Sequence, residues 1–314
     1  MYSKQYLLHT LFALALLASY SPTTYTKPAV AALGVDWQYD FLTTGSLPVV
    51  GADKKVVESA NGFRALLRGK GIKTMLSADH HTRQSKSFSK NNTDENGEPL
   101  PDYSQVMSND VLVKTWPEHC VQDSDGAKIA IEVFEDDVIF YKGDIDEGDS
   151  YSAFFRIKHV TGNENIETGL KDYCKENNIR HLFVDGLALN VCVKDSVLDA
   201  LLLFGAEMKP HIRLNSCRGV MSREAEVQAI EEMIDAGATF FFVDKEEDRN
   251  DITNYWLNAL GNKINVVSSD EEYVDSIILQ DKKEDKEANA AEEENALLEA
   301  IEIEAGNKSR NTQC

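Results

Sequence analysis

The chain has 314 residues, with 32 Lys and Arg against 53 Asp and Glu, which gives a formal net charge of −21. This acidity argues against nucleic acid or an anionic membrane surface as a main partner, because both are bound through clustered Lys and Arg. Hydrophobic residues make up 42% of the chain, which is enough for a core. No apolar run reaches the length of a membrane span, and five cysteines are too few and too scattered for a disulfide scaffold.

The first 26 residues are predicted to be a secretory signal peptide. Lys4 precedes a mostly apolar run from Tyr6 to Ala18, which is the layout of a leader that directs export. The alternative is a buried helix or strand of the fold, but the first clear domain strand starts later, near Lys27. We therefore expect a secreted protein with no membrane contact once the signal is removed.

Between residues 27 and 244, short apolar runs alternate with longer stretches of helical pattern. The expected strands are Ala29–Val35, Ile72–Ser77, Val138–Tyr141, His181–Asp185, Glu207–Leu214 and Thr239–Val243. The expected helices are Asp53–Arg68, Asn165–Glu176, Val191–Phe204 and Ser222–Ala236. The alternation predicts an α/β fold with a doubly wound, mostly parallel six-stranded sheet and helices on both faces. In such sheets, sites form at the carboxyl ends of the strands.

The C-terminal part of the chain has a different composition. Residues 250–280 are apolar enough to pack onto the domain, so residues 27–280 are expected to form one domain with a C-terminal extension. From Asp281 to Glu304 there are ten acidic residues against three lysines. This composition favours a solvated, partly disordered acidic tail over residues 281–314, with a frayed helix as the alternative.

Three of the expected strands lead into residues that could carry chemistry. The first ends at Asp36, the third at Lys142, and the fourth leads to Cys192. Taken singly, each residue has a plainer interpretation: a turn cap, a surface lysine and a small core residue. If a helix begins at Val191, its backbone N–H groups and dipole favour a thiolate at Cys192. Together, a carboxylate, an ammonium group and a thiol suit nucleophilic attack on a carbonyl.

The second strand leads into a pair of potential metal ligands. Asp79 and His81 are two residues apart, so in an extended chain they point the same way. His119, further along the chain, would be a third ligand and would leave open positions on the metal, as catalytic sites require. A single histidine would be better explained as ordinary surface, so the prediction depends on the pair of Asp79 and His81.

These motifs, in this order, resemble the isochorismatase-like cysteine hydrolases, and within that family the nicotinamidases. The similarity extends over about Lys27–Asp244. It is carried by five segments: Val35–Phe41, Ala78–His81, Trp116–Val121, Lys142–Phe154 and Gly186–Val193. Each segment alone is a weak signal, whereas five in order at plausible spacing are specific.

The resemblance implies a division of labour among the strand-end residues. Cys192 would attack a carboxamide carbon and form a thioester, and Asp36 would take the thiol proton and pass it to departing ammonia. Lys142 would orient Asp36. The backbone N–H groups of Ala188 and Cys192 would receive the oxyanion, and the family has a cis peptide bond before the position of Ala188.

The resemblance also implies one divalent metal ion on Asp79, His81 and His119, with zinc expected and iron or manganese as alternatives. The metal would bind the pyridine nitrogen of the substrate and thus position it without activating the nucleophile. Three aromatic residues would wall the substrate ring, unless they are ordinary core: Phe41, Trp116 and Tyr151.

The sequence departs from the family pattern at three places. Thr82–Ser87 offers no further histidine, Leu189-Asn190 replaces the usual Thr-Asp, and His80 replaces a common Trp. We expect a metal-dependent hydrolase that converts nicotinamide to nicotinate and ammonia. The alternatives are another cysteine amidase acting on a carbamoyl or ureido substrate, and a secreted acidic matrix or binding protein on an inactive scaffold. The expected partner is a small-molecule amide, and whether the chain forms a homo-oligomer stays open.

Overall fold

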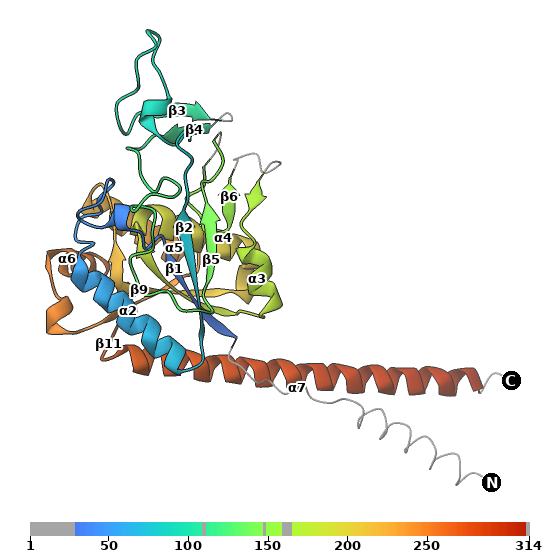
Figure 1. The fold of residues 1–314 in the computed structure, drawn as a ribbon. Helices are drawn as coiled ribbons and strands as arrows, with labels where there is room; N and C mark the ends of the chain where they lie inside the picture. The colour runs from blue at the N-terminus through green and yellow to red at the C-terminus, as the bar shows by residue number, and fades with distance from the viewer. Residues whose placement is uncertain (1–28, 109–110, 147–148, 159–164, 312–314) are drawn as a thin grey trace. The chain divides into compact units, whose positions relative to one another are not determined.

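A computed structural model describes residues 29–108, 111–146, 149–158 and 165–311 of the chain (Figure 1). Residues Ala29–Ile278 form one compact unit, and the chain from Leu279 onward groups apart from it. The predicted signal peptide, residues 1–26, lies outside the described residues, so export stays a prediction.

The compact unit is built around a seven-stranded sheet in the order β11-β10-β9-β8-β1-β2-β5, in which every neighbouring pair is parallel. The strands are β1 (Val30–Val35), β2 (Lys73–Asp79), β5 (Val138–Lys142), β8 (His181–Leu187), β9 (Lys209–Arg218), β10 (Thr239–Val243) and β11 (Ile264–Val267). The doubly wound parallel fold is confirmed. The sheet has one strand more than expected, because β11 adds to the edge beside β10.

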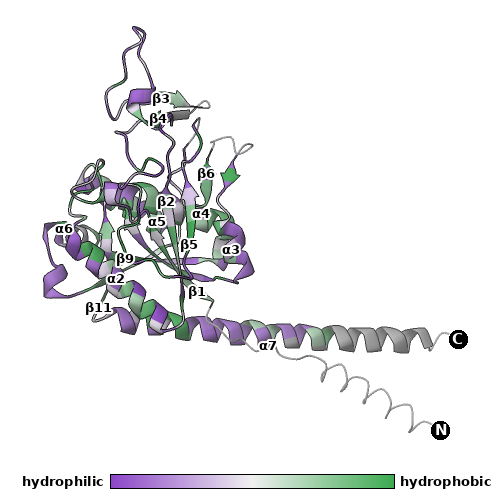
Figure 2. Cartoon of the chain, in the orientation of Figure 1, coloured by the Kyte–Doolittle hydropathy of each residue, from purple (hydrophilic) through white to green (hydrophobic). Residues whose placement is uncertain are grey.

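Helices cover both faces of this sheet. They are α2 (Lys54–Gly69), α3 (Leu170–Glu176), α4 (Lys194–Phe204), α5 (Arg223–Asp235), α6 (Asp251–Leu260) and α7 (Asp270–Asn311). Side chains alternate along a strand, so Ala31 and Leu33 of β1 join the core under α3 to α6, whereas Val30 and Ala32 face α2 and the start of α7. Hydrophobic and hydrophilic residues alternate around α2, as expected for a helix packed on a sheet (Figure 2).

Two of the expected helices begin later than predicted. The helix expected from Asn165 begins at Leu170, because Gly169 adopts a left-handed φ of 95° and Ile166–Glu167 forms β7, paired with β6 (Phe155–Ile157). The helix expected from Val191 begins at Lys194, because a π-helical turn, η3 (Leu189–Val193), precedes it. A further hairpin, β3 (Gln105–Ser108) and β4 (Val111–Lys114), projects beyond the carboxyl ends of the strands (Figure 1).

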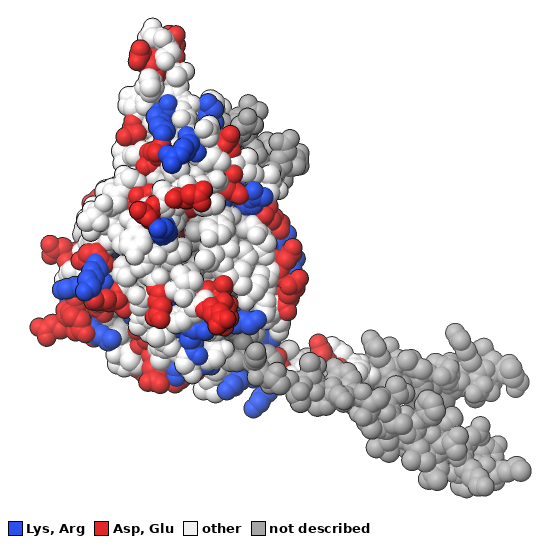
Figure 3. Space-filling view, viewed as in Figure 1, with Lys and Arg blue, Asp and Glu red and all other residues white. Residues whose placement is uncertain are grey.

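Helix α7 continues through residues 281–311, where the composition favoured a partly disordered tail. Ala, Glu and Lys are strong helix formers, and pairs four residues apart add support, as between Lys283 and Glu287 or Gln280 and Glu284. Among the described residues, no helix is long and apolar enough to cross a membrane. Acidic and basic side chains are interspersed on the face seen in Figure 3, with no broad basic patch there.

Candidate active site

The predicted catalytic residues meet where the strand order reverses. Strand β1 lies between β2 and β8, so the chain winds outward in both directions from this point, which is where open α/β sheets bind ligands. The carboxyl ends of β1 and β8 bring Asp36 and Cys192 together with Asp79 from β2. One ligand atom from each of these three residues lies within 4.8 Å of the other two.

Lys142, the last residue of β5, is fully buried at the centre of this cluster. Its Nζ lies 3.0 Å from Asp36 Oδ2, donates to Asp79 Oδ1 and to Ser150 O at 3.2 Å, and lies 3.6 Å from Cys192 Sγ. Burial disfavours the ammonium charge, but the two carboxylates hold the pKa of Lys142 well above its ordinary value. Lys142 is therefore not an ordinary surface lysine, and it gives the cluster a buried positive charge.

Asp36 is held in an unusual backbone conformation just past the end of β1. Its φ of 49° lies in the left-handed region, which a non-glycine residue adopts at some cost. Its carboxylate accepts a hydrogen bond of 2.7 Å from Ser77 Oγ, and its N–H donates to Ser77 O at 3.2 Å. Burial raises the pKa of Asp36 above its ordinary value, and Lys142 opposes that rise. Asp36 therefore faces the cluster and can exchange a proton there.

Cys192 lies in the π-helical turn before α4 and is 6% exposed. Burial raises the pKa of its thiol well above the ordinary value, and the nearby Lys142 only partly offsets this. The expectation of a thiolate in the free protein is therefore corrected, since desolvation outweighs the field of the turn and of the ammonium group. A neutral thiol needs a neighbouring base, and Asp36 is within reach.

The expected cis peptide bond is present between Leu187 and Ala188. It follows Gly186, whose φ of 137° and close approach to the backbone of Val35 leave no room for a Cβ. Ala188 and Cys192 both line the same pocket. The predicted oxyanion donors therefore stand at its wall.

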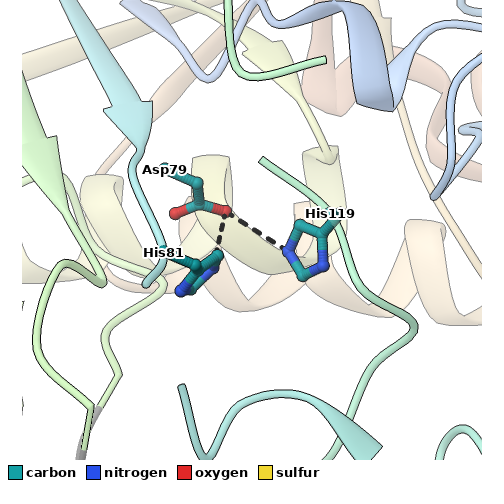
Figure 4. Close-up of side chains that lie close together, drawn as sticks. All are labelled: Asp79, His81 and His119. Carbon is teal, nitrogen blue, oxygen red and sulfur yellow. Dashed lines mark ion pairs between the residues drawn. The ribbon is translucent and has the colours of Figure 1, made fainter. Parts of the chain in front are cut away.

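The three predicted metal ligands also converge (Figure 4). Asp79 Oδ2 lies 3.7 Å from Nε2 of both His81 and His119. Nδ1 of His81 faces Gly143 O at 2.9 Å and Nδ1 of His119 faces Pro117 O at 2.7 Å. Because a carbonyl can only accept, Nδ1 carries the proton in each neutral imidazole, and Nε2 then offers a lone pair.

This arrangement fits a divalent metal ion. The buried Nε2 of His81 has no hydrogen-bond partner among the described residues, although an unpaired buried nitrogen is costly. Two imidazoles and one carboxylate are a typical donor set for zinc and leave positions open for further ligands. Burial alone would raise the pKa of Asp79, but Lys142 and the two histidines hold it well below its ordinary value. The carboxylate is therefore ionised, as a metal ligand must be.

Gln38 fixes the backbone of Asp79, a role that sequence analysis missed. Its Nε2 donates to Asp79 O at 2.7 Å, and its Oε1 accepts from Asp79 N at 2.8 Å. Asp79 thus turns one oxygen toward Lys142 and the other toward the histidines. The signal for Gln38 was its place two residues after Asp36, in the segment Val35–Phe41 that carries part of the family resemblance.

A pocket opens over these groups, and its walls include all three aromatic residues expected there. Trp116 Nε1 donates to Tyr151 OH at 2.9 Å, and the two rings meet edge to face with centroids 6.1 Å apart. Phe41 lies against His119, with ring centroids 5.5 Å apart. Sequence analysis missed five further lining residues, the acidic Asp149 and the apolar Leu47, Val49, Val191 and Val220. The pocket therefore suits a small, flat, mostly apolar ring.

Asn190, one of the departures from the family pattern, has a clear structural use. Its side-chain amide donates to Val220 O at 2.8 Å and accepts from Val220 N at 2.9 Å. The turn that carries Cys192 is thereby joined to the loop after β9. An aspartate could accept from Val220 N but could not donate to the carbonyl.

The fold and this site define a family. Residues 30–242 match the family model of the isochorismatase domain, and the chain belongs to that family. Among curated relatives, the nicotinamidase of Escherichia coli (strain K12) is 35% identical over 217 residues, which span 68% of this chain and 95% of that protein.

Solved structures of similar proteins agree with this assignment. A nicotinamidase pyrazinamidase from Acinetobacter baumanii is 26% identical with a TM-score of 0.58, and the similarity covers 68% of this chain and 96% of that one. The pyrazinamidase of Pyrococcus horikoshii, solved in complex with zinc, is 26% identical with a TM-score of 0.54 and coverage of 68% and 98%.

Proposed function

We propose that this protein hydrolyses nicotinamide to nicotinate and ammonia through a thioester on Cys192. One observation carries the proposal: Lys142 Nζ lies 3.0 Å from Asp36 and 3.6 Å from Cys192 Sγ, and Cys192 lines a pocket together with three aromatic rings. The nicotinamidase of E. coli, which this chain matches along 95% of its length, supports the choice of substrate.

The reaction starts with a neutral thiol. Cys192 gives its proton to Asp36 while its sulfur attacks the carboxamide carbon, and the carbonyl oxygen becomes an oxyanion. The backbone N–H groups of Ala188 and Cys192 would stabilise that charge, and one such donor contributes roughly 3–4 kcal/mol. Lys142 keeps its proton throughout and holds the Asp36 carboxylate beside the sulfur.

Asp36 then acts as an acid and afterwards again as a base. It returns the proton to the amide nitrogen, the C–N bond breaks, and ammonia leaves behind a thioester. Water attacks the thioester carbon and gives a proton to Asp36, the C–S bond breaks, and the proton returns to Cys192. The second proton of the water leaves the new carboxyl group for ammonia, so the products are nicotinate, ammonium and the original thiol.

Asp79, His81 and His119 would hold the divalent ion, and we propose zinc because two imidazoles and a carboxylate suit it. The zinc complex of the P. horikoshii pyrazinamidase supports this choice. Bound there, the metal would supply a Lewis-acid position for the ring nitrogen and so orient the carboxamide toward Cys192. We also propose that the protein is exported, as the apolar run Tyr6–Ala18 suggests; the N-terminus of the mature protein would test this.

The two alternative functions account for less of the site. Amidases of the same family that act on carbamoyl or ureido groups usually lack the metal ligands, so the convergence of Asp79, His81 and His119 favours nicotinamide. An inactive scaffold would have no use for Lys142 buried between two carboxylates, because burying charges costs several kcal/mol each.

Ammonia release from nicotinamide, measured beside release from carbamoyl amides, tests the proposal. Cys192→Ala should lower turnover by at least about a thousandfold, because no other cysteine among the described residues lines the pocket. Cys174→Ala is the matched control, since it removes a buried thiol in α3 that does not line the pocket. Substantial ammonia release by the Cys192→Ala protein would remove the mechanism.

A further inference from the structure

Trp37, the residue after Asp36, is held in place by a hydrogen bond as well as by core packing. It is fully buried, and its indole Nε1 donates a hydrogen bond of 3.0 Å to Asp185 Oδ1. Gly34 makes room for the ring, because a Cβ at that position would lie 3.1 Å from Trp37 Cδ1. The indole is therefore fixed both in position and in direction.

Asp185 is itself held rigidly. It lies in β8 and is 4% exposed, and its second oxygen accepts a hydrogen bond of 2.7 Å from Ser216 Oγ. Ser216 Oγ in turn accepts from Arg213 Nη1 at 2.9 Å, and Arg213 forms a two-bond pair with Asp270 at 2.6 and 2.8 Å. Each oxygen of this buried carboxylate thus accepts a hydrogen bond from a donor that is itself held in place.

This hydrogen-bond network is connected to the active site through the position of Asp185 in the chain. Strand β8 leads directly from Asp185 to Ala188 and then to Cys192. On the other side, Asp36 holds a left-handed φ of 49° between Trp37 and the end of β1. Such a conformation costs about 1–3 kcal/mol and persists only where its surroundings determine it. The bond from Trp37 to Asp185 ties the strained segment to β8, the strand that leads into the turn with Cys192.

We infer that Asp185 is a positioning residue, which acts through the Trp37 indole to hold the Asp36 carboxylate against Lys142 and Cys192. The expected effect of Asp185 on turnover rests on the proposed function. Its expected effect on the reactivity of the Cys192 thiol can be measured without a substrate. Asp185 does not line the pocket, and its side chain is linked to the Asp36 segment by the hydrogen bond from Trp37.

Two tryptophan variants make a matched test. Trp37→Phe keeps a ring in place but removes the N–H that Asp185 accepts. Trp256→Phe makes the same loss elsewhere, because Trp256 is also fully buried and its Nε1 donates to the buried Glu226 at 2.8 Å. Both should lower the melting temperature by a similar amount. Only Trp37→Phe should lower kcat on nicotinamide, by about tenfold to a hundredfold with KM within about threefold, because it misplaces the base and not the substrate.

Variants at Asp185 separate the hydrogen bond from simple packing. Asp185→Asn keeps an oxygen that accepts from Trp37, whereas Asp185→Leu keeps a side chain branched at Cγ and leaves both donors unpaired. The asparagine variant should therefore have a kcat at least about tenfold above that of the leucine variant. Equal kcat values in two folded variants would overturn the inference.

A second readout needs no substrate. The rate at which iodoacetamide alkylates Cys192, followed by peptide mass spectrometry at pH 7, depends on the thiolate fraction and hence on a base within reach. It should fall at least about threefold in Trp37→Phe relative to Trp256→Phe. If the wild-type protein does not hydrolyse nicotinamide but this difference appears, the proposed function fails and the positioning role stands. If the two variants react alike and turn over alike, the positioning role fails.

Discussion

Strand β5 carries a buried ion pair at each of its ends, and the two pairs serve different purposes. Before its first residue, Asp137 meets Arg64 from α2, with Oδ2 2.6 Å from Nη2. At its last residue, Lys142 meets Asp36 at 3.0 Å and also contacts Asp79. Arg64 and Asp137 are 2% and 0% exposed, and Lys142 and Asp36 are both fully buried, so burial alone does not distinguish them.

The difference lies in the ratio of charges. Asp137 has one principal cation, Arg64, and its oxygens also accept from Thr74 Oγ1 and from Phe134 N at 2.7 Å. Lys142 is instead shared by two carboxylates and a thiol. The first pair is close to neutral and backed by neutral donors. The second leaves an excess of anionic and proton-accepting groups, which can take up a metal ion or a proton.

The two ion pairs of β5 also differ in where they lie relative to the pocket. Asp79 and Cys192 from the second cluster line the pocket, whereas Arg64 and Asp137 do not. In a parallel sheet, carboxyl ends gather loops that can bind ligands, and the amino ends serve the fold. A buried ion pair is therefore evidence of function only when its charges are unbalanced and it borders a pocket.

Among the variants considered below, removal of the cation Lys142 at the carboxyl end of β5 should have the largest effect on turnover. Lys142→Met leaves Asp36 and Asp79 without their counter-charge, which raises the pKa of Asp36 further. The base must be ionised, so the acidic limb of the pH–rate profile moves to higher pH, and kcat at pH 7 falls by about 10²- to 10⁴-fold.

The control for this variant is Lys158→Met. Lys158 also pairs with a buried carboxylate, Asp199, outside the pocket. Its removal should lower the melting temperature without moving the pH–rate profile. An unshifted acidic limb in a folded Lys142→Met protein would contradict the role given to Lys142.

Metal binding gives the next prediction, and two adjacent histidines supply its control. His81→Ala removes a ligand, so the metal content measured by elemental analysis should fall from about one ion per chain to near zero. The affinity should drop by at least about a hundredfold. His80→Ala should keep both metal and turnover, because His80 lies against the ring of Tyr141 with centroids 4.7 Å apart. Metal-free protein that turns over nicotinamide at the wild-type rate would count against the proposed metal site.

The fold could be predicted from the sequence where the strands are apolar and the helices are long. The prediction failed at short segments, whose structure depends on tertiary contacts. Strand β11 was missed because Ile264–Val267 is four residues long with only Ile264 buried, so no periodicity marks it. The start of α3 was misplaced because the left-handed φ of Gly169 breaks a run that looks helical from Asn165. Such boundaries depend on neighbours that local patterns do not contain.

The site was predictable where one residue follows one strand, as with Asp36, Asp79 and Lys142. Contacts made by several segments were not, and Val220 shows why. It reaches the pocket because Asn190 holds its backbone, and nothing in a Gly-Val pair after a strand indicates this. The thiolate expected at Cys192 was wrong for a similar reason, since local turn geometry can be read from the chain but the depth of burial cannot.

The amino end of β5 gives the prediction with the smallest effect on turnover. Arg64→Met leaves Asp137 buried without its principal cation, so the free energy of unfolding should fall by about 3–5 kcal/mol in denaturant titrations. The double variant Arg64→Met/Asp137→Asn should recover part of that loss, because no uncompensated charge remains. Neither should change kcat, since four residues of β5 separate Asp137 from Lys142 and neither member of the pair lines the pocket. If Arg64→Met lowered kcat in folded protein, the two ends of β5 would be coupled and the division between a stabilising pair and a reactive cluster would fail.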